Sequence, residues 1–278
     1  MTYFELRKYL VDKLFDICSD EAEREASIIL EHSSGLDRGQ IVAKYKEPVS
    51  EKVEKDTKDL LGIRLRRVPL AYVTGKTGFM GYTLQCRPGV LIPRPDTETV
   101  CEKAMEFIHE GDHIADVCCG SGCIGLALVK KKNVTADLFD ISDEAVKLSR
   151  LNAKELGVAE KVNIFKRNLF ANGFFDKCEK YDVIVSNPPY IKTEVIDSLS
   201  PEVKREPKWA LDGGGDGTLF YRRLLKVCPP MIKSGGHLVL EIGYDQKQSI
   251  MALCSSKGYT CTVYKDYGNN DRICVVDF

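Results

Sequence analysis

The sequence predicts an α/β domain with a mostly parallel sheet covered by helices on both faces, preceded by a small helical domain. Two observations carry this prediction. After Pro95, short apolar segments rich in β-branched residues alternate with segments of helical length, which is typical of parallel sheets in α/β proteins. Before about residue 67, apolar residues recur instead at helical spacing.

The N-terminal part predicts a bundle of helices. Leu6, Leu10 and Leu14 recur every four residues and define the apolar face of a first helix. A second helix is expected to end near Gly35, and Ser50 can cap the start of a third. We therefore expect residues 1–74 to form a helical domain.

Residues 75–92 differ in amino-acid composition from the segments before and after them. Four glycines punctuate aromatic and β-type residues such as Phe79 and Tyr82. This pattern predicts a β-hairpin, and we expect it to link the helical domain to a catalytic domain over residues 93–278.

The strands of that second domain follow from short apolar runs. They are expected at His113–Cys118, Val134–Phe139, Val162–Phe165, Val183–Ser186, His237–Ile242, Thr260–Tyr264 and Arg272–Asp277. Helices are expected at Glu98–Glu110, Ser121–Lys130, Asp143–Leu156, Leu219–Val227 and Asp245–Ser256. Only a turn-rich stretch separates the last two strands, so they predict a hairpin in which one strand runs antiparallel.

Composition excludes several classes of function. The 278 residues carry a net charge of −1, so the basic excess of a broad phosphate-binding surface is lacking. The eleven cysteines include no C-x-x-C pair and have no histidine at ligand spacing, so we expect neither a metal site nor a disulfide framework. Without a signal peptide or an apolar segment of membrane-spanning length, a cytoplasmic protein that binds neither nucleic acid nor membrane is expected.

A glycine-rich turn follows the first predicted strand of the sheet. Gly120 and Gly122 allow the backbone to approach a ligand closely, at the strand end where open α/β sheets bind their ligands. About twenty residues later Asp140 ends the second strand, where a carboxylate can accept both hydroxyls of a ribose. Together these features predict a cofactor that contains adenosine.

The glycine pattern alone leaves the identity of that cofactor open. Residues 120–125 match the dinucleotide fingerprint G-x-G-x-x-G, so a nicotinamide dehydrogenase is one interpretation. S-adenosylmethionine is the other, since its methyl group needs a positioned nucleophile. A glycine turn without a ligand would also explain the pattern.

Such a positioning device is predicted by the tetrapeptide Asn187-Pro188-Pro189-Tyr190, which directly follows a buried strand. Two successive prolines fix the backbone and remove its donors. The carbonyls and the Asn187 side-chain oxygen would then form rigid acceptors for the two hydrogens of a planar NH2 group. The tetrapeptide therefore favours an N-methyltransferase, although Asn-Pro also occurs in ordinary strand-ending turns.

With these motifs assembled, the chain resembles the peptide-chain release-factor glutamine methyltransferases, the PrmC/HemK family. The resemblance runs nearly end to end, and its most specific segment is Gly89–Glu98, GVLIPRPDTE. Other segments that look familial are Pro69–Tyr72, Phe79–Gly81, Ala210–Gly214 and Glu241–Gly243.

The resemblance implies a seven-stranded, Rossmann-like class I S-adenosylmethionine-dependent methyltransferase fold behind the helical domain. It implies N5-methylation of the glutamine in the Gly-Gly-Gln motif of class 1 release factors, which act in translation termination. S-adenosylhomocysteine would be the product. The helical domain would help to dock the release factor, and we expect the chain to act as a monomer.

The resemblance also assigns residues to the site. Cofactor contacts fall on Asp116, Cys118, Cys119, Gly120, Ser121, Gly122, Asp140, Asn168, Leu169 and Asn187. The catalytic and substrate-binding set is Asn187, Pro188, Pro189 and Tyr190, with Arg94 on the substrate side. Arg94 could instead order the interdomain turn or be an ordinary surface residue.

Three positions depart from the family pattern. The family usually has glycine where Cys118 stands and often threonine at Cys119. It usually has an acidic residue where Asn168 stands, near the adenine amino group; an amide oxygen can still accept a hydrogen bond there. The departures bear on cofactor affinity and leave the reaction type unchanged.

Other functions share some of these motifs. A ribosomal-protein glutamine methyltransferase would use the same tetrapeptide and the same chemistry. A DNA adenine-N6 methyltransferase would need a basic groove and a target-recognition domain, which the balanced charge disfavours. A non-catalytic factor that binds termination complexes is a further alternative.

Overall fold

The structure is a computed structural model that describes all 278 residues. The chain forms two compact units. The first contains Met1–Gly75 together with Ser200–Arg205, and the second contains Lys76–Leu199 and Glu206–Phe278. None of the helices combines the length and apolar character needed to cross a lipid bilayer.

The first unit is helical, as the sequence predicts. Its helices are α1 (Tyr3–Cys18), α2 (Ala22–Ser34), α3 (Arg38–Ala43), α4 (Glu51–Leu65) and α5 (Leu70–Thr74). Thr2 caps α1 in a capping box, Gly35 ends α2 with a φ of 70°, and the Ser50 side chain accepts the Val53 N–H at the start of α4. The short α3 and α5 have too few turns to show a periodic pattern in the sequence.

A buried ion-pair network joins α2, α4 and the returning segment Ser200–Arg205. Arg64 in α4 is only 3% exposed. Its guanidinium donates to Glu25 at 2.7 Å and to Glu202 at 2.9 Å. Because a buried guanidinium needs paired carboxylates, this network fixes the segment that contains Glu202 within the helical unit.

The second unit begins with an antiparallel hairpin of β1 (Lys76–Phe79) and β2 (Tyr82–Gln85). Phe79 and Leu84 are buried in the same apolar cluster as residues of the main sheet. The predicted hairpin therefore covers Lys76–Gln85, a part of the range 75–92, and it packs as part of the second unit.

The main sheet has seven strands in the order β5-β4-β3-β6-β7-β9-β8. Their bounds are β3 (His113–Val117), β4 (Thr135–Asp140), β5 (Val162–Lys166), β6 (Tyr181–Ser186), β7 (Ile232–Glu241), β8 (Thr260–Lys265) and β9 (Asp271–Asp277). Strand β9 is antiparallel to both its neighbours, and the remaining pairs are parallel. The predicted fold class, with one antiparallel strand, is confirmed.

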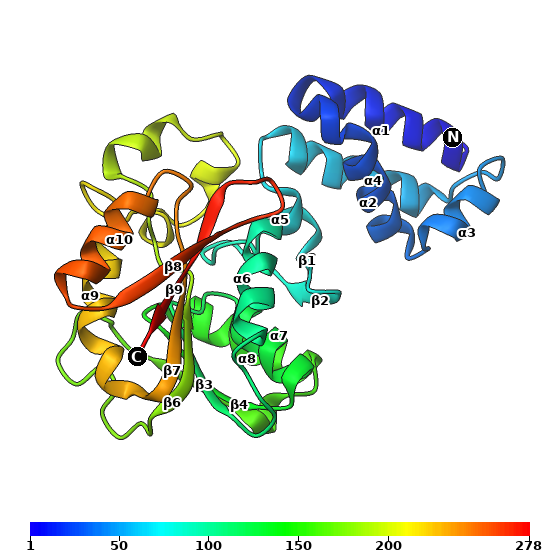
Figure 1. Ribbon diagram of the computed structural model, residues 1–278. Helices are drawn as coiled ribbons and strands as arrows, with labels where there is room; N and C mark the ends of the chain where they lie inside the picture. Colours follow the sequence, from blue (N-terminus) through cyan, green and yellow to red (C-terminus); the bar gives the residue numbers. More distant parts are fainter. The chain divides into compact units, whose positions relative to one another are not determined.

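Helices cover both faces of this sheet (Figure 1). One face packs against α6 (Pro95–Met105), α7 (Cys123–Lys132) and α8 (Asp143–Glu155), and the other against α9 (Leu219–Val227) and α10 (Lys247–Ser256). Short 3-10 helices lie at Ser19–Glu21, Ala159–Lys161, Thr193–Ser198, Val203–Arg205, Lys208–Ala210 and Pro229–Met231.

The strand order reverses between β3 and β6, so their carboxyl ends form the switch point where such sheets bind ligands.

Element boundaries differ from the predictions at several places, and helix α6 spans Pro95–Met105 rather than the predicted Glu98–Glu110. Helix α7 begins at Cys123 rather than Ser121, because Gly120 and Gly122 have φ values of 56° and 79°. Strand β3 ends at Val117, because Cys118 has a φ of 63°. Strand β7 begins earlier than predicted, at Ile232, and its register with β6 shifts before His237.

Candidate active site

A pocket opens at the carboxyl ends of the central strands. It has about 1040 Å³ of empty space, part of it open to solvent. Its wall is mostly apolar and comes from the segment Leu91–Arg94, the loop after β3, the ends of β4 and β6, residues Arg167–Phe170, and the stretch that contains Trp209. An apolar wall with a few polar groups suits a nucleoside ligand.

The loop after β3 owes its shape to backbone in the left-handed region. Cys118, Gly120 and Gly122 all have positive φ. A Cβ on Gly122 would lie 2.8 Å from Leu126, whereas a Cβ on Gly120 would meet nothing closer than 3.9 Å. Gly122 is therefore required for packing the start of α7, and Gly120 leaves open space beside the pocket.

Asp140, the last residue of β4, is fixed by the same loop. Its two carboxylate oxygens accept the Gly120 and Ser142 N–H groups, each at 2.9 Å. Burial raises the pKa of Asp140, and the backbone hydrogen bonds oppose that rise. Each oxygen keeps a free lone pair, so Asp140 can accept the two hydroxyls of a ribose.

Asp116 lies behind the pocket wall and does not line it. One carboxylate oxygen accepts the Gly125 N–H at 2.8 Å, and the other, Oδ1, is buried without a partner. Desolvation raises the pKa of Asp116 to about 7. A Cβ on Gly125 would come within 3.0 Å of this carboxylate. The hydrogen bond between Gly125 and Asp116 joins the first turn of α7 to β3.

The Asn187 side chain is oriented by a chain of hydrogen bonds. Its Nδ2 donates to Thr97 Oγ1 at 3.2 Å, and Thr97 donates to Glu241 Oε2 at 2.7 Å. Because Thr97 gives its proton to the carboxylate, it can only accept from Asn187, which fixes the amide nitrogen toward Thr97. The amide oxygen then remains a free acceptor on a residue that lines the pocket.

Glu241 anchors this network from the end of β7. It is 2% exposed, and the Tyr190 hydroxyl donates to its other oxygen at 3.2 Å. Burial raises the pKa of Glu241, whereas the bonds from Thr97 and Tyr190 and the charge of Arg272 lower it. We name Asn187, Thr97, Glu241 and Tyr190 the Asn187 network.

The backbone after the tetrapeptide is also fixed. Ile191 pairs with the segment around Asp212, and the Gly213 N–H donates to its carbonyl at 2.7 Å. A Cβ on Gly213 would lie 2.7 Å from the backbone of Tyr190, so this contact requires glycine. Gln246 donates to the Tyr190 carbonyl at 3.0 Å.

Arg94 lines the pocket and pairs with the buried Glu206. The other oxygen of Glu206 accepts the Ile92 N–H at 2.9 Å. Glu206 therefore holds both ends of the short segment before α6, and the Arg94 side chain is 39% exposed. These contacts favour an ordering role for Arg94 while leaving part of it accessible.

The pocket brings together most of the predicted site residues. Those that line it are Arg94, Cys118, Cys119, Gly120, Ser121, Asp140, Asn168, Leu169, Asn187 and Pro189. Four others lie outside its wall: Asp116, Gly122, Pro188 and Tyr190. The Asn168 oxygen accepts the Phe170 N–H at 2.9 Å, so it retains one lone pair for a ligand.

Sequence reasoning missed the residues that act through contacts distant in the chain. Thr97 and Glu241 lie in the segments that carry the family resemblance, but nothing local shows that they meet Asn187. Ile141 and Trp209 also line the pocket. The signal for Ile141 was its place directly after Asp140, whereas Trp209 gave none.

Two protein families match the chain. The family described as PrmC N-terminal domain matches residues 5–75, and the family described as Methyltransferase small domain matches residues 100–241. The second match includes the loop after β3, Asp140 and the tetrapeptide.

Curated relatives match over nearly the whole length. Release factor glutamine methyltransferase from Clostridium acetobutylicum is 35% identical over 254 residues, covering 90% of this chain and 89% of that protein. The chain belongs to the release factor glutamine methyltransferase family. The enzyme of that name from Caulobacter vibrioides is 36% identical over 268 residues, covering 94% and 91% of the two chains.

Solved structures support the fold of this release factor glutamine methyltransferase family member. A methyltransferase from Pyrococcus furiosus has a TM-score of 0.55 at 20% identity, covering 72% of this chain and 89% of that one. A ribosomal protein L11 methylase from Lactobacillus delbrueckii has a TM-score of 0.50 at 19% identity, covering 69% and 82%. At these identities the likeness concerns the fold alone.

Family membership decides between the cofactors that the glycine pattern left open. The protein is an enzyme that uses S-adenosylmethionine as methyl donor. The pocket fits that molecule, because a buried carboxylate with free lone pairs, Asp140, stands in an otherwise largely apolar wall beside the open backbone of Gly120.

Proposed function

We propose that this enzyme methylates the N5 nitrogen of the glutamine in the Gly-Gly-Gln motif of class 1 release factors. The relatives named above support the substrate. The observation that carries the chemistry is the free amide oxygen of Asn187, oriented by Thr97 and Glu241. That oxygen lies where a carboxamide NH2 group entering the pocket would need an acceptor.

The loop after β3 and the end of β4 would hold the cofactor. Asp140 would accept the ribose hydroxyls, and Ile141 and Leu169 offer apolar surface for the adenine. The Asn168 oxygen would accept the adenine amino group with its remaining lone pair. When bound, S-adenosylmethionine supplies an electrophilic methyl group.

The chain itself would contribute positioning and electrostatics. A carboxamide nitrogen is a weak nucleophile because its lone pair is delocalised into the carbonyl. Asn187 Oδ1 would accept one amide hydrogen. The backbone carbonyl of Pro188, between the pocket-lining Asn187 and Pro189, would accept the other, which draws electron density toward the nitrogen and fixes its direction. Holding reactants in this way lowers the barrier without a strong base.

The pocket agrees with a mechanism that lacks a dedicated base. None of the four histidines lines it. Asp140, its one acidic residue, is held by two backbone N–H groups. We infer that the amide proton leaves to water after methyl transfer, when the nitrogen has become acidic.

We propose a role for Tyr190 that differs from the direct substrate contact that the family resemblance assigns to it. A side chain packed flat on the substrate amide would line the pocket, but Tyr190 does not, and its hydroxyl donates to Glu241. We infer that Tyr190 stabilises the ionised form of Glu241 and so acts as a positioning residue for Asn187.

We propose a division of labour along the chain. Residues 1–74 would dock the release factor, residues 75–92 would link, and residues 93–278 would carry out the transfer, as a monomer. The proposed substrate places the reaction in the cytoplasm, where translation terminates.

The proposal is tested with purified components. The enzyme is incubated with S-adenosylmethionine and a class 1 release factor, and peptides are mapped by mass spectrometry. We expect one added methyl group on the Gly-Gly-Gln glutamine and none when that glutamine is replaced by alanine. A methyl group on another residue, or only on a ribosomal protein supplied in parallel, would refute the proposed substrate.

A further inference from the structure

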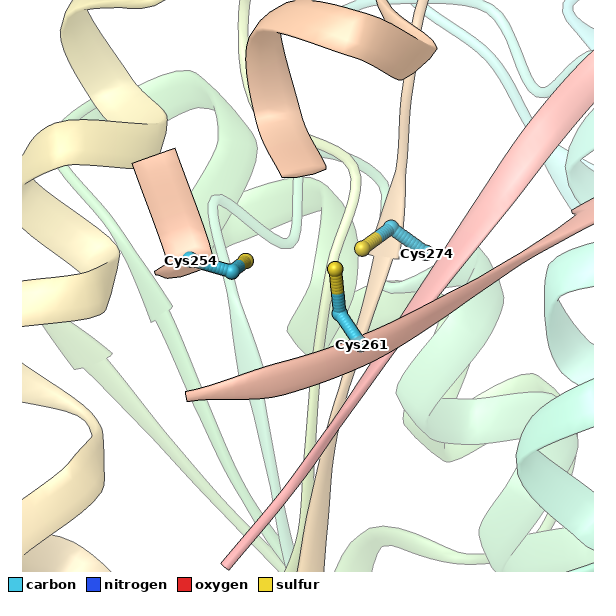
Figure 2. Close-up of side chains that lie close together, drawn as sticks. All are labelled: Cys254, Cys261 and Cys274. Atoms are coloured by element: carbon cyan, nitrogen blue, oxygen red, sulfur yellow. The ribbon is translucent and has the colours of Figure 1, made fainter. Parts of the chain in front are cut away.

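Three cysteines that do not line the pocket converge at the edge of the main sheet. The Sγ atoms of Cys254, Cys261 and Cys274 all lie within 4.8 Å of one another. They come from α10, β8 and β9, and Figure 2 shows their sulfurs pointing toward a common centre. None of the three belongs to the candidate active site.

The strand register explains why two of these thiols share one face. Cys261 lies opposite Val276, and Cys274 lies opposite Val263. Residues two apart on a strand face the same side, so Cys261 and Cys274 are diagonal neighbours beneath α10. Cys254 near the end of α10 packs in the same apolar cluster, which completes the triangle.

A disulfide between Cys261 and Cys274 does not match this arrangement. Diagonal residues on paired strands have Cα atoms about 7–8 Å apart, whereas a disulfide needs roughly 4.4–6.8 Å. An ion placed between the sulfurs spans the longer distance. With metal–sulfur bonds of about 2.3 Å, as for zinc, three sulfurs around one ion are about 4 Å apart, which the observed cluster allows.

The three sulfur ligands indicate which metal ion the cluster would bind. No histidine or carboxylate joins the three sulfurs, and their surroundings include the apolar Ile250, Val263 and Val276. Zinc in structural sites takes four ligands, whereas soft thiolates alone suit copper(I). We propose that Cys254, Cys261 and Cys274 bind one copper(I) ion in trigonal coordination.

Binding is a simple exchange of protons for metal. Each thiol that ligates gives its proton to solvent, and its sulfur lone pair forms a bond to copper, which stays in the +1 state. Cys254 and Cys274 are fully buried, whereas Cys261 lies half-buried on the edge strand β8. The ion would enter past Cys261 and cross-link α10 to the terminal strands.

The test uses the full-length chain and copper(I) under anaerobic conditions, in competition with a coloured copper(I) chelator. We expect one copper(I) withdrawn per chain and three sulfur ligands by X-ray absorption spectroscopy. In Cys261→Ala the affinity should fall by at least about 100-fold, because loss of a direct ligand should exceed the 10–100-fold effect of losing an outer-shell partner. Copper(I) should also raise the melting temperature of the unaltered chain.

Cys18→Ala is the matched control, since Cys18 is also half-buried but lies in the first unit. It should bind copper(I) like the unaltered chain. Circular dichroism of the metal-free variants checks that both are folded. We expect both to fold, because Cys18 and Cys261 are only half-buried. The proposal is overturned if the unaltered chain withdraws no copper, if Cys261→Ala withdraws it equally well, or if copper has only two sulfur ligands.

Discussion

At the scale of single residues, Asn187 is the side chain on which the chemistry depends. In Asn187→Ala the turnover number should fall by about 10²–10³, the cost of removing one polar group from a preorganised site. Affinity for S-adenosylhomocysteine should change by much less. Stopped-assay kinetics and calorimetry on the same preparation measure the two effects. Near-normal turnover would exclude a role for Asn187 in holding the substrate amide.

Asp140→Ala is the matched comparison, in which we expect cofactor affinity to be the property that is lost. Because Asp140 would accept the ribose hydroxyls, its loss should weaken binding of S-adenosylhomocysteine by at least about tenfold, since each charge-assisted hydrogen bond contributes roughly 1.5–3 kcal/mol. Unchanged affinity would reject the ribose contact, whatever the effect on turnover.

Cys118 shows how a single departure from the family pattern is accommodated. The backbone keeps the left-handed conformation that glycine adopts easily, with a φ of 63°. For other residues this conformation costs about 1–2 kcal/mol.

Two variants at this position isolate that cost. Cys118→Gly should be more stable than Cys118→Ala by about 1 kcal/mol, which reverses the usual order of these two residues. Denaturant unfolding of both variants measures the difference. An alanine variant as stable as the glycine variant would show that the backbone is not strained in solution.

At the scale of elements, the first turn of α6 and the end of β7 meet through the Asn187 network. Thr97→Val keeps the shape of the side chain but removes both hydrogen bonds, so the Asn187 amide is free to rotate. Turnover should fall by about tenfold with little change in cofactor affinity, in keeping with the roughly 0.5–1.5 kcal/mol of one hydrogen bond.

Thr97→Ser distinguishes positioning from packing. The serine hydroxyl can make the same two hydrogen bonds, so turnover should recover although a methyl group is lost. If Thr97→Ser were as slow as Thr97→Val, the hydroxyl would have no role in orienting Asn187.

The burial of Asp116, which joins β3 to α7, predicts that stability depends on pH. Because the pKa of Asp116 is raised from 3.8 to about 7 in the folded chain, the folded state holds a proton that the unfolded state releases between these values. The stability that this proton contributes is therefore present below about pH 4 and is lost as the pH rises to 7.

Asp116→Asn, which cannot ionise, removes this dependence. Its free energy of unfolding relative to the unaltered chain should increase between pH 4 and pH 8, as measured from urea midpoints. A constant difference across that range would mean that Asp116 titrates normally in the fold.

At the scale of the whole molecule, the chain passes from the second unit into the first at Ser200 and returns at Glu206. Arg64 holds this excursion by binding Glu202, and it also neutralises the buried Glu25. Arg64→Ala should cost about 3–5 kcal/mol, because it leaves a buried carboxylate uncompensated. Chemical unfolding of the variant measures this loss.

A second substitution identifies the source of that loss. In Glu25→Gln/Arg64→Ala the buried charge is absent, so a substantial part of the stability should return. If the double variant were no more stable than Arg64→Ala, the cost would come from packing rather than from the unpaired carboxylate.

The sequence could predict what depends on local pattern. The alternating strands and helices, the antiparallel terminal strand, and the caps at Gly35 and Ser50 all follow from periodicity and residue type, and the structure contains them. Asp140 and Asn187 were found because each directly follows or ends a predicted strand at one edge of the sheet.

What the sequence could not show depends on contacts between distant segments. Thr97 and Glu241 are 144 positions apart, and the three cysteines at the sheet edge lack the spacing of known metal motifs. The left-handed conformation of Cys118 and the return of Ser200–Arg205 to the helical unit also follow from tertiary packing, which no local pattern encodes.

The central claim is that Asn187 Oδ1 and the Pro188 carbonyl hold a carboxamide nitrogen toward the bound cofactor. A crystal structure with S-adenosylhomocysteine and a Gly-Gly-Gln peptide tests it most directly. We predict the glutamine nitrogen at about 2.9 Å from both Asn187 Oδ1 and the Pro188 carbonyl, facing the cofactor sulfur. A glutamine side chain bound elsewhere, or an Asn187 Oδ1 turned away from that sulfur, would contradict the account.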